Sequence, residues 1–400
     1  MDPTAISLAK LLSECLFEVR DAVERARCLD LPFLQWPYSD LEAPRARVQD
    51  WIASQAGYQP GLMIPNGGGG QIFDAGAAQA LLALSLKFGV DETATWYSSL
   101  LSGKLTTGLS VWLVQGIKTA SPIPITEQVS LIPFAAIPQS RMTDEAAQFV
   151  LPEHRLSFGR SPTMATLSAL VVSYEFDQRL VPNGSSFSSP TVTSMGQIVE
   201  GLSLVGPSSV RPVRHWSQTA DPMFEFVRGG SGYGEMHHDL AWTVGAPEAY
   251  LSSASVGIVQ KYVPLAEKHP HLSISVQRLS AALRRNAPTD KAIELGTALE
   301  SAISGDSKTE ITHRLSLRVA RLLGADLDER KKIRSTMKAF YEMRSNAVHT
   351  GRTGREYKIS GQPKMTSSSL ADAAQRYLVD CLRLFVTHGS VPDWDDLELS

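Results

Sequence analysis

The chain has little cysteine. Only three of its 400 residues are cysteines, namely Cys15, Cys28 and Cys381, and none of them belongs to a CxxC pair. Structural zinc sites draw on closely spaced cysteines and histidines, so this spacing offers no zinc site. Few and scattered cysteines are also typical of proteins that work in a reducing compartment, and not of secreted proteins held together by disulfides.

Long apolar runs and a strong net charge are absent as well. No run approaches the ~20 apolar residues that span a bilayer. The N-terminal sequence MDPTAISLAKLL has an acid before its base and no long apolar core, unlike a signal peptide. We therefore expect a soluble, cytoplasmic protein that does not enter a membrane. The formal net charge of −3 argues against a broad basic surface that coats nucleic acid, although a local basic site remains compatible with it.

Two stretches resemble binding motifs but lack residues that such motifs need. Gly67 to Gly70 form a glycine run, but no Gly-Lys-Ser/Thr follows and the GxGxxG spacing is missing. We interpret the run as a connection between elements. His237 and His238 are adjacent, so they would point to opposite sides of a strand or about 100° apart on a helix. Without a third partner they are poor joint metal ligands, and a metal-dependent enzyme built on them is the least favoured alternative. We expect no metal and no cofactor.

A chain of this length is expected to form two or three domains. Its patterns predict an α+β protein in three parts: a helical N-terminal region at 1–100, a β-rich domain of unknown role at 101–246, and an all-α bundle at 247–400. In the first part, apolar residues recur with a period near 3.6 over 4–28, and a second helix is expected over 45–56. In the second, runs of β-branched, aromatic and aliphatic residues predict mainly antiparallel strands at 109–114, 129–134 and 170–176.

Helical patterns fill the C-terminal part, and short loops between them predict an up-and-down bundle. Gly324 and Gly351 mark the expected ends of two of these helices. The expected helices cover 248–267 (with an uncertain break), 272–285, 289–304, 308–323, 327–349 and 367–387.

Arg344 is unusual because it falls within the apolar stripe of the helix expected at 327–349. On a wheel of ~100° per residue it lies close to Met337 and Phe340. Burying an unpaired guanidinium there would cost about several kcal/mol. Arg344 must therefore meet a carboxylate, a partner surface or a phosphate. Its planar, permanently charged fork suits a phosphate.

His349 follows Arg344 by five residues and falls on another face of the same wheel. The two side chains converge only if the helix ends or bends there, or if two copies of the helix face each other. Histidine titrates near neutral pH and suits proton transfer. Asn346, about one turn before His349, is placed to bond the imidazole or a phosphate. RNA supplies its own nucleophile, the 2′-hydroxyl, so a base, an acid and a phosphate-holding cation suffice for cleavage without a metal.

Arg318 also falls inside an apolar face, that of the helix expected at 308–323. The favoured interpretation is a buried structural ion pair with Glu300 or Glu310, since a buried guanidinium needs a counter-charge.

Residues from about 270 to 390 resemble HEPN domains, and more narrowly the Apea-like HEPN group of bacterial proteins. The resemblance implies a helical bundle that dimerises and, in many members, a metal-independent ribonuclease with an Arg-(four to six residues)-His motif. It implies that Arg344 and His349 are the catalytic pair in a cleft to which both subunits contribute. One departure is that Ser345 follows the arginine where active members often carry Asn, Asp or His. The stretches that carry the resemblance are Ala298-Leu299-Glu300-Ser301, Glu310-Ile311-Thr312, Leu315-Ser316-Leu317-Arg318-Val319-Ala320 and Tyr341 through Gly351.

The sequence therefore predicts a homodimeric endoribonuclease, in bacterial antiphage defence or a toxin-like role, whose N-terminal half senses an unknown trigger or restrains the nuclease. The alternative is a non-catalytic HEPN-type dimerisation or interaction protein, in which Arg344 is an interface ion-pair residue.

Overall fold

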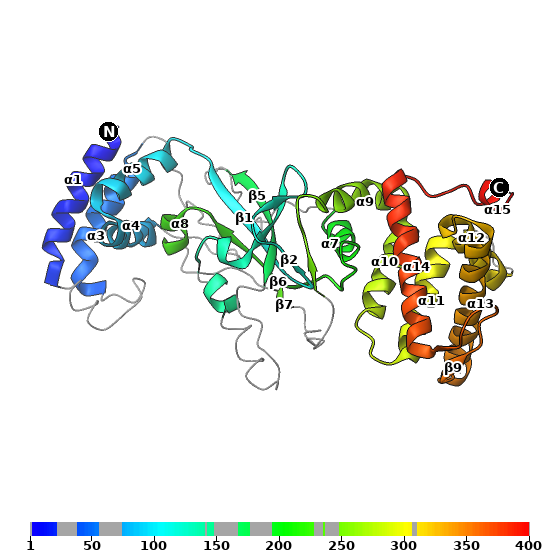
Figure 1. The fold of residues 1–400 in the computed structure, drawn as a ribbon. Coiled ribbons are helices and arrows are strands. Elements are labelled where there is room, and N and C mark those ends of the chain that lie inside the picture. Colours follow the sequence, from blue (N-terminus) through cyan, green and yellow to red (C-terminus); the bar gives the residue numbers. More distant parts are fainter. Residues whose placement is uncertain are drawn as a thin grey trace.

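Helices occupy both ends of the elongated molecule, and a β-sheet lies between them in this computed structural model (Figure 1). The fold class inferred from the sequence is confirmed, since the chain is α+β with a helical C-terminal region. No described helix is long and apolar enough to cross a membrane. The glycine run at 67–70 and the pair His237-His238 lie outside the described residues. The structure describes residues 2–21, 38–55, 74–140, 142–147, 167–176, 194–227, 235–236, 248–305 and 310–399.

The N-terminal helices bury a core rich in leucine and alanine. The first of them begins after Asp2, whose carboxylate accepts a hydrogen bond from the backbone N–H of Thr4. It ends at Glu18, residues 20 and 21 are helical again, and residues 22–28 of the expected helix lie outside the described residues. The helix expected from residue 45 instead begins at Tyr38 and continues through Pro44, although proline usually interrupts a helix interior. The helices are α1 (Pro3–Glu18), α3 (Tyr38–Ala53), α4 (Asp74–Phe88) and α5 (Val90–Leu101).

The described part of the chain forms a central sheet of six strands in the order β3-β4-β5-β1-β6-β7, and all neighbours are antiparallel. The strands expected at 109–114, 129–134 and 170–176 are confirmed as β1, β4 and β5. Strand β6 was not among the strands expected from the sequence. The strands are β1 (Thr106–Gln115), β3 (Ile123–Pro124), β4 (Val129–Pro133), β5 (Ser168–Phe176), β6 (Arg211–Thr219) and β7 (Glu235–Met236).

Both faces of this sheet are covered, because alternate residues of a strand point to opposite sides. Leu113 of β1 packs with Trp216 and with Phe134 of the short helix η2 (Phe134–Ala136). Its neighbours Trp112 and Val114 belong to the other face, which packs against α7 (Met195–Ser203). A further helix, α8 (Pro222–Val227), packs against α4 and joins the N-terminal core instead.

A strand pairing and a set of hydrogen bonds link the sheet region to the C-terminal bundle. Strand β2 (Ile117–Lys118) pairs in parallel with β8 (Ala249–Tyr250). This pairing explains why the helix expected from residue 248 begins only at Val256. From the bundle, Arg383 donates hydrogen bonds to the backbone carbonyls of Leu204 (2.8 and 3.1 Å) and Val205 (3.0 Å), just after α7.

The C-terminal bundle has one large core, and apart from the late start of α9 the boundaries of its expected helices lie within three residues of those predicted. The longest described helix, α13, follows Asp326, whose carboxylate accepts a hydrogen bond from the N–H of Glu329, and it ends before Gly351, which has the left-handed conformation. A two-stranded ribbon of β9 (Glu356–Tyr357) and β10 (Met365–Thr366) connects it to α14. The helices are α9 (Val256–Lys268), α10 (Pro270–Ala282), α11 (Pro288–Ile303), α12 (Ile311–Leu323), α13 (Leu327–Thr350), α14 (Ser367–His388) and α15 (Trp394–Leu399).

Candidate functional site on helix α13

Arg344 lies on the bundle-facing side of α13 and forms an ion pair with Glu300 of α11. Its Nη2 is 3.1 Å from Glu300 Oε1 and donates a hydrogen bond of 3.2 Å to Oε2. The side chain of Arg344 is 28% exposed and that of Glu300 is 25% exposed, so the pair is half-buried. The expectation that this arginine must meet a counter-charge is met within one chain.

Gly296 makes room for this arginine one helical turn before Glu300. A Cβ atom built on Gly296 would stand 2.6 Å from Arg344 Cγ and 3.0 Å from its Nε. No real side chain tolerates the shorter contact, so the arginine stem crosses α11 directly over the glycine. Gly296 was not among the site residues expected from the sequence. A glycine inside an otherwise strong helical pattern is the signal that could have found it, because such a glycine often marks close packing.

Two polar atoms of this site are buried without a hydrogen-bond partner among the described residues: Arg344 Nε and the hydroxyl of Tyr341. Tyr341 lies one turn before Arg344. Burial, and next the negative charge of Glu300, raise the pKa of Tyr341 well above its ordinary value, while Arg344 opposes them. The phenol therefore stays protonated and can donate a hydrogen bond. Unsatisfied buried donors of this kind carry an energetic cost of about 1–3 kcal/mol each.

Glu300 is affected by the same burial. Desolvation raises the pKa of its carboxyl above the ordinary value, and the positive charge of Arg344 partly offsets that rise. Burial therefore outweighs the ion pair, as desolvation often does for charge pairs withdrawn from water. The site therefore favours the charged form of Glu300 less than water does.

His349 and Asn346 are exposed at the C-terminal end of α13, away from the ion pair. The helix does not end or bend between Arg344 and His349 but runs on to Thr350. Five residues of regular helix separate two side chains by about 140° around the axis. Asn346 accepts a hydrogen bond from the Thr350 hydroxyl through its backbone oxygen (2.7 Å), and no described contact joins its side chain to His349. Of the two ways for the motif to converge, only the meeting of two copies is left.

Arg318 is buried and ion-paired, but its partner is not the one expected. The guanidinium is 3% exposed, and its Nε donates to Glu398 Oε1 at 2.7 Å. Glu300 is taken by Arg344, and Glu310 is exposed at the start of α12 with a left-handed φ of 51°. The predicted pairing of Arg318 with Glu300 or Glu310 is therefore wrong. No local pattern indicated Glu398, which lies 80 residues away in sequence.

The surroundings of Arg318 explain why it points toward the end of α11. Its Nη1 donates to the carbonyls of Ile303 (2.7 Å) and Ser304 (2.6 Å), which are the unsatisfied acceptors at that helix's C-terminus. The ring of Trp394 covers the guanidinium at 4.8 Å. Arg318 thus holds both the end of α11 and the C-terminal helix α15 in place.

Comparisons with known proteins add nothing to this geometry. No protein-family model, no curated protein and no solved structure matches the chain. Among the described residues, no group of three or more histidine, cysteine or carboxylate side chains is arranged to hold a metal ion.

Proposed function

We propose that this protein is a metal-independent endoribonuclease of the HEPN type, acting in the cytoplasm in bacterial antiphage defence or a toxin-like role. The observation that carries the proposal is Arg344, a half-buried arginine with an unsatisfied Nε, five residues before an exposed histidine on one continuous helix of a helical bundle. Cleavage of RNA by its own 2′-hydroxyl needs a base, an acid and a cation that holds the phosphate, and a histidine and an arginine can fill these roles.

In this mechanism Arg344 holds the scissile phosphate, and its guanidinium offsets the charge that builds up on the phosphate oxygens. A His349 imidazole removes the proton from the 2′-hydroxyl, whose oxygen attacks phosphorus. The bond to the 5′-oxygen breaks, and that oxygen takes its proton from the imidazolium that has just formed. The products are a 2′,3′-cyclic phosphate and a 5′-hydroxyl, with no water consumed in this step. Asn346 would bond the phosphate or orient the imidazole.

The site needs two copies of the chain, because Arg344 and His349 of one α13 face different directions. A homodimer that brings two α13 helices together places the histidine of one copy near the arginine of the other. Val348, between Ala347 and His349, is 46% exposed, and burying it would favour such an interface. The N-terminal half, in this proposal, binds a trigger or restrains the nuclease.

The ion pair with Glu300 defines the resting state of the proposed site. A substrate phosphate must compete with the Glu300 carboxylate for the same guanidinium, and Nε is the donor that the carboxylate leaves unsatisfied. Because burial already disfavours the charged form of Glu300, exchange of the carboxylate for a phosphate is less costly than breaking a fully stabilised pair.

The same ion pair favours a second candidate, a non-catalytic protein in which the bundle serves only for assembly. Arg344 already has a counter-charge within its own chain, and this gives it a structural role that needs no RNA. In that case Arg344→Ala would weaken the bundle or its dimer, and no form of the protein would cut RNA.

One experiment separates the two candidates. Wild type, Arg344→Ala and His349→Ala are expressed, and RNA integrity and growth are followed, with purified protein assayed on RNA with and without a chelator. Matched controls are His388→Ala, an exposed histidine in the last turn of α14, and Arg314→Ala, a half-buried arginine on α12.

The proposal expects chelator-resistant cleavage by wild type and both controls, and loss of it in both motif variants. Cleavage that persists in Arg344→Ala and His349→Ala overturns it. If wild type never cuts RNA and Arg344→Ala changes the molecular size in solution, the assembly role is supported instead.

A further inference from the structure

A short ribbon, residues 352–366, follows helix α13 and carries a local excess of positive charge. It consists of the strand β9, a turn and the strand β10, and the chain enters it directly after the end of α13 (Figure 1). Its charged residues are four cations, Arg352, Arg355, Lys358 and Lys364, and one carboxylate, Glu356, which together give a formal charge of +3. The whole chain has a formal charge of −3. The ribbon is therefore a basic element in a slightly acidic protein.

Three of these four cations have no carboxylate partner among the described residues. Glu356 lies 3.6 Å from Lys364 and so accounts for one of them. Arg352, Arg355 and Lys358 are exposed, and no ion pair joins them to a described side chain. Cations that gather on one surface without partners repel one another and attract a polyanion. The charges of the ribbon are thus available to a ligand and do not hold the fold together.

The ribbon is held in place because its apolar side chains belong to the core of the bundle. Tyr357 is 5% exposed and Ile359 is 2% exposed. They alternate with the exposed Glu356 and Lys358, as neighbours on an extended chain do. The Tyr357 hydroxyl also accepts a hydrogen bond of 2.8 Å from the N–H of Gly354. The cations therefore stand on a fixed scaffold, which reduces the entropy lost when a ligand binds them.

The turn of the ribbon is attached to the face of α13 that carries the proposed catalytic histidine. Gln362 Nε2 donates a hydrogen bond of 3.0 Å to the Ser335 hydroxyl. Helix α13 is continuous from there to its end, and at about 100° per residue Asn346 and His349 lie within about 40° of Ser335 around the axis. Arg344 lies on the opposite side by the same measure. The ribbon thus flanks the side of α13 on which His349 is exposed.

We propose that the ribbon binds the backbone of a single-stranded RNA, with Arg352, Arg355 and Lys358 against phosphates next to the one that is cut. This inference deepens the proposed nuclease and rests on it for the position of the cut. A phosphate backbone suits exposed cations without a base-reading pocket, because its charges repeat along the strand whatever the sequence. A single strand is favoured because the attacking 2′-oxygen and the leaving 5′-oxygen must come into line at phosphorus, and an unpaired nucleotide can turn to reach that geometry.

The test measures RNA binding by fluorescence anisotropy on the full chain carrying His349→Ala, in which the proposed mechanism leaves RNA intact. The probe is a labelled single-stranded RNA of mixed sequence, titrated over a series of salt concentrations. Adding Arg352→Gln/Arg355→Gln/Lys358→Gln, the ribbon variant, should weaken binding by about tenfold or more at low salt. The slope of log affinity against log salt should become shallower by about 2, since each lost phosphate contact on a single strand removes about 0.7.

A matched control removes three other exposed cations, and a further variant should improve binding. Lys10→Gln/Lys261→Gln/Lys268→Gln changes the net charge equally at exposed positions of α1 and α9, away from the ribbon (Figure 1). It should bind RNA much as the parent does, because distant exposed charges are screened by salt. Glu356→Gln should bind RNA more tightly than the parent, because it removes the one carboxylate of the ribbon and releases Lys364. Such a gain cannot result from misfolding.

The outcomes separate the ribbon from the nuclease. A chain that never cuts RNA, but whose binding is lost in the ribbon variant and kept in the control, supports this inference and overturns only the proposed nuclease. The inference is wrong if the parent binds no RNA, if the ribbon and control variants bind equally, or if Glu356→Gln binds more weakly than the parent. Each of these results holds whatever the cleavage assay shows.

Discussion

Gly296 and Arg344 are in direct contact across two helices, and the contact leaves no space for a methyl group. The Cγ atom of the arginine would lie 2.6 Å from a Cβ on residue 296. A side chain at residue 296 would therefore force Arg344, which is paired with Glu300, or helix α11 to shift.

The first prediction concerns Gly296→Ala. Replacing a helical glycine by alanine usually stabilises by about 0.4–1 kcal/mol, but overpacking costs about 1–3 kcal/mol. We expect Gly296→Ala to be no more stable than wild type, and Gly257→Ala, at an open position, to be more stable. Urea unfolding measures both. A clear gain in stability for Gly296→Ala would contradict the contact.

The second prediction concerns Glu300 and pH. Its folded-state pKa is raised by burial, so the folded state binds the proton more tightly than the unfolded chain does. The stability of wild type relative to Glu300→Gln should therefore be highest below the ordinary glutamate pKa of about 4.3. It should fall as the pH rises through the raised value. Unfolding free energies of the two proteins over a pH series test this.

Removing Arg344 provides a second arm of that measurement. Its positive charge lowers the pKa of Glu300, so the pKa should rise further in Arg344→Ala. Two stability differences are compared: wild type minus Glu300→Gln, and Arg344→Ala minus Arg344→Ala/Glu300→Gln. The second difference should fall at a higher pH than the first. A shift to lower pH would mean that the ion pair does not form in solution.

The third prediction concerns Arg318. Arg318→Met removes a buried cation that bonds two carbonyls and Glu398. Breaking a buried charge pair by removing one partner costs about 3–5 kcal/mol. Lys331→Met, at a side chain 66% exposed, should change stability by about 0.5 kcal/mol or less. Denaturant unfolding compares the two, and similar small losses would show that α15 does not rest on Arg318.

The fourth prediction rests on the proposed nuclease. If Arg344 of one copy acts with His349 of the other, an Arg344→Ala chain paired with a His349→Ala chain contains one intact site. In a random mixture half of the dimers are mixed, and each mixed dimer has one intact site out of two. The mixture should therefore recover about a quarter of wild-type cleavage. No recovery on mixing, measured with RNA on co-expressed chains, would mean that each site needs more than one intact pair.

Local patterns predicted the elements of the bundle well, because periodicity and caps are local properties. The helices expected at 289–304 and 327–349 differ by one residue at their ends from α11 and α13. Strand β6 was missed in part because Arg211–Thr219 alternates poorly, with a proline at its second position.

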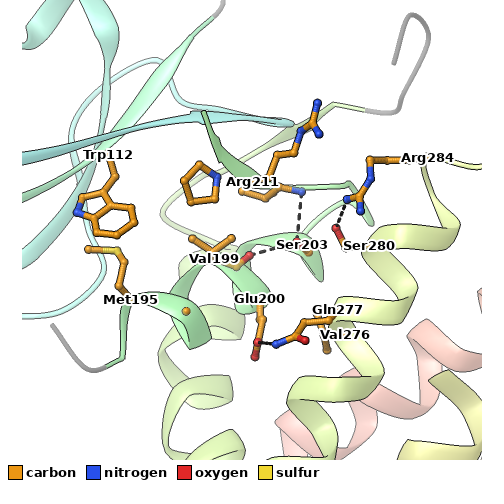
Figure 2. Close-up of a pocket in the computed structure, with 13 residues that line it drawn as sticks. Trp112, Met195, Val199, Glu200, Ser203, Arg211, Val276, Gln277, Ser280 and Arg284 are labelled. Atoms are coloured by element: carbon orange, nitrogen blue, oxygen red, sulfur yellow. Dashed lines mark hydrogen bonds between the residues drawn. The ribbon is translucent and has the colours of Figure 1, made fainter. Parts of the chain in front are cut away.

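The geometry of the candidate site could be predicted only in part. A wheel shows that Arg344 is turned toward the bundle, since that depends on one helix alone. It does not show which carboxylate lies opposite, and Glu300 was assigned to the wrong arginine. Partner choice depends on how α11, α12 and α15 pack, and the 80 residues between Arg318 and Glu398 carry no local signal of it. A cavity lined by residues of β1, α7, β6 and α10, among them Trp112 and Gln277, likewise forms only where the sheet meets the bundle (Figure 2).

The hydrogen bonds from Arg383 to the carbonyls of Leu204 and Val205 determine where a recombinant C-terminal fragment should begin. Arg383 of α14 reaches back to them across 179 and 178 residues of chain, and Leu204 itself belongs to the core of the bundle. A fragment that starts at residue 247 would leave a guanidinium without its acceptors and an opening in its apolar interior. Recombinant versions of the C-terminal half should therefore begin before α7, near residue 194.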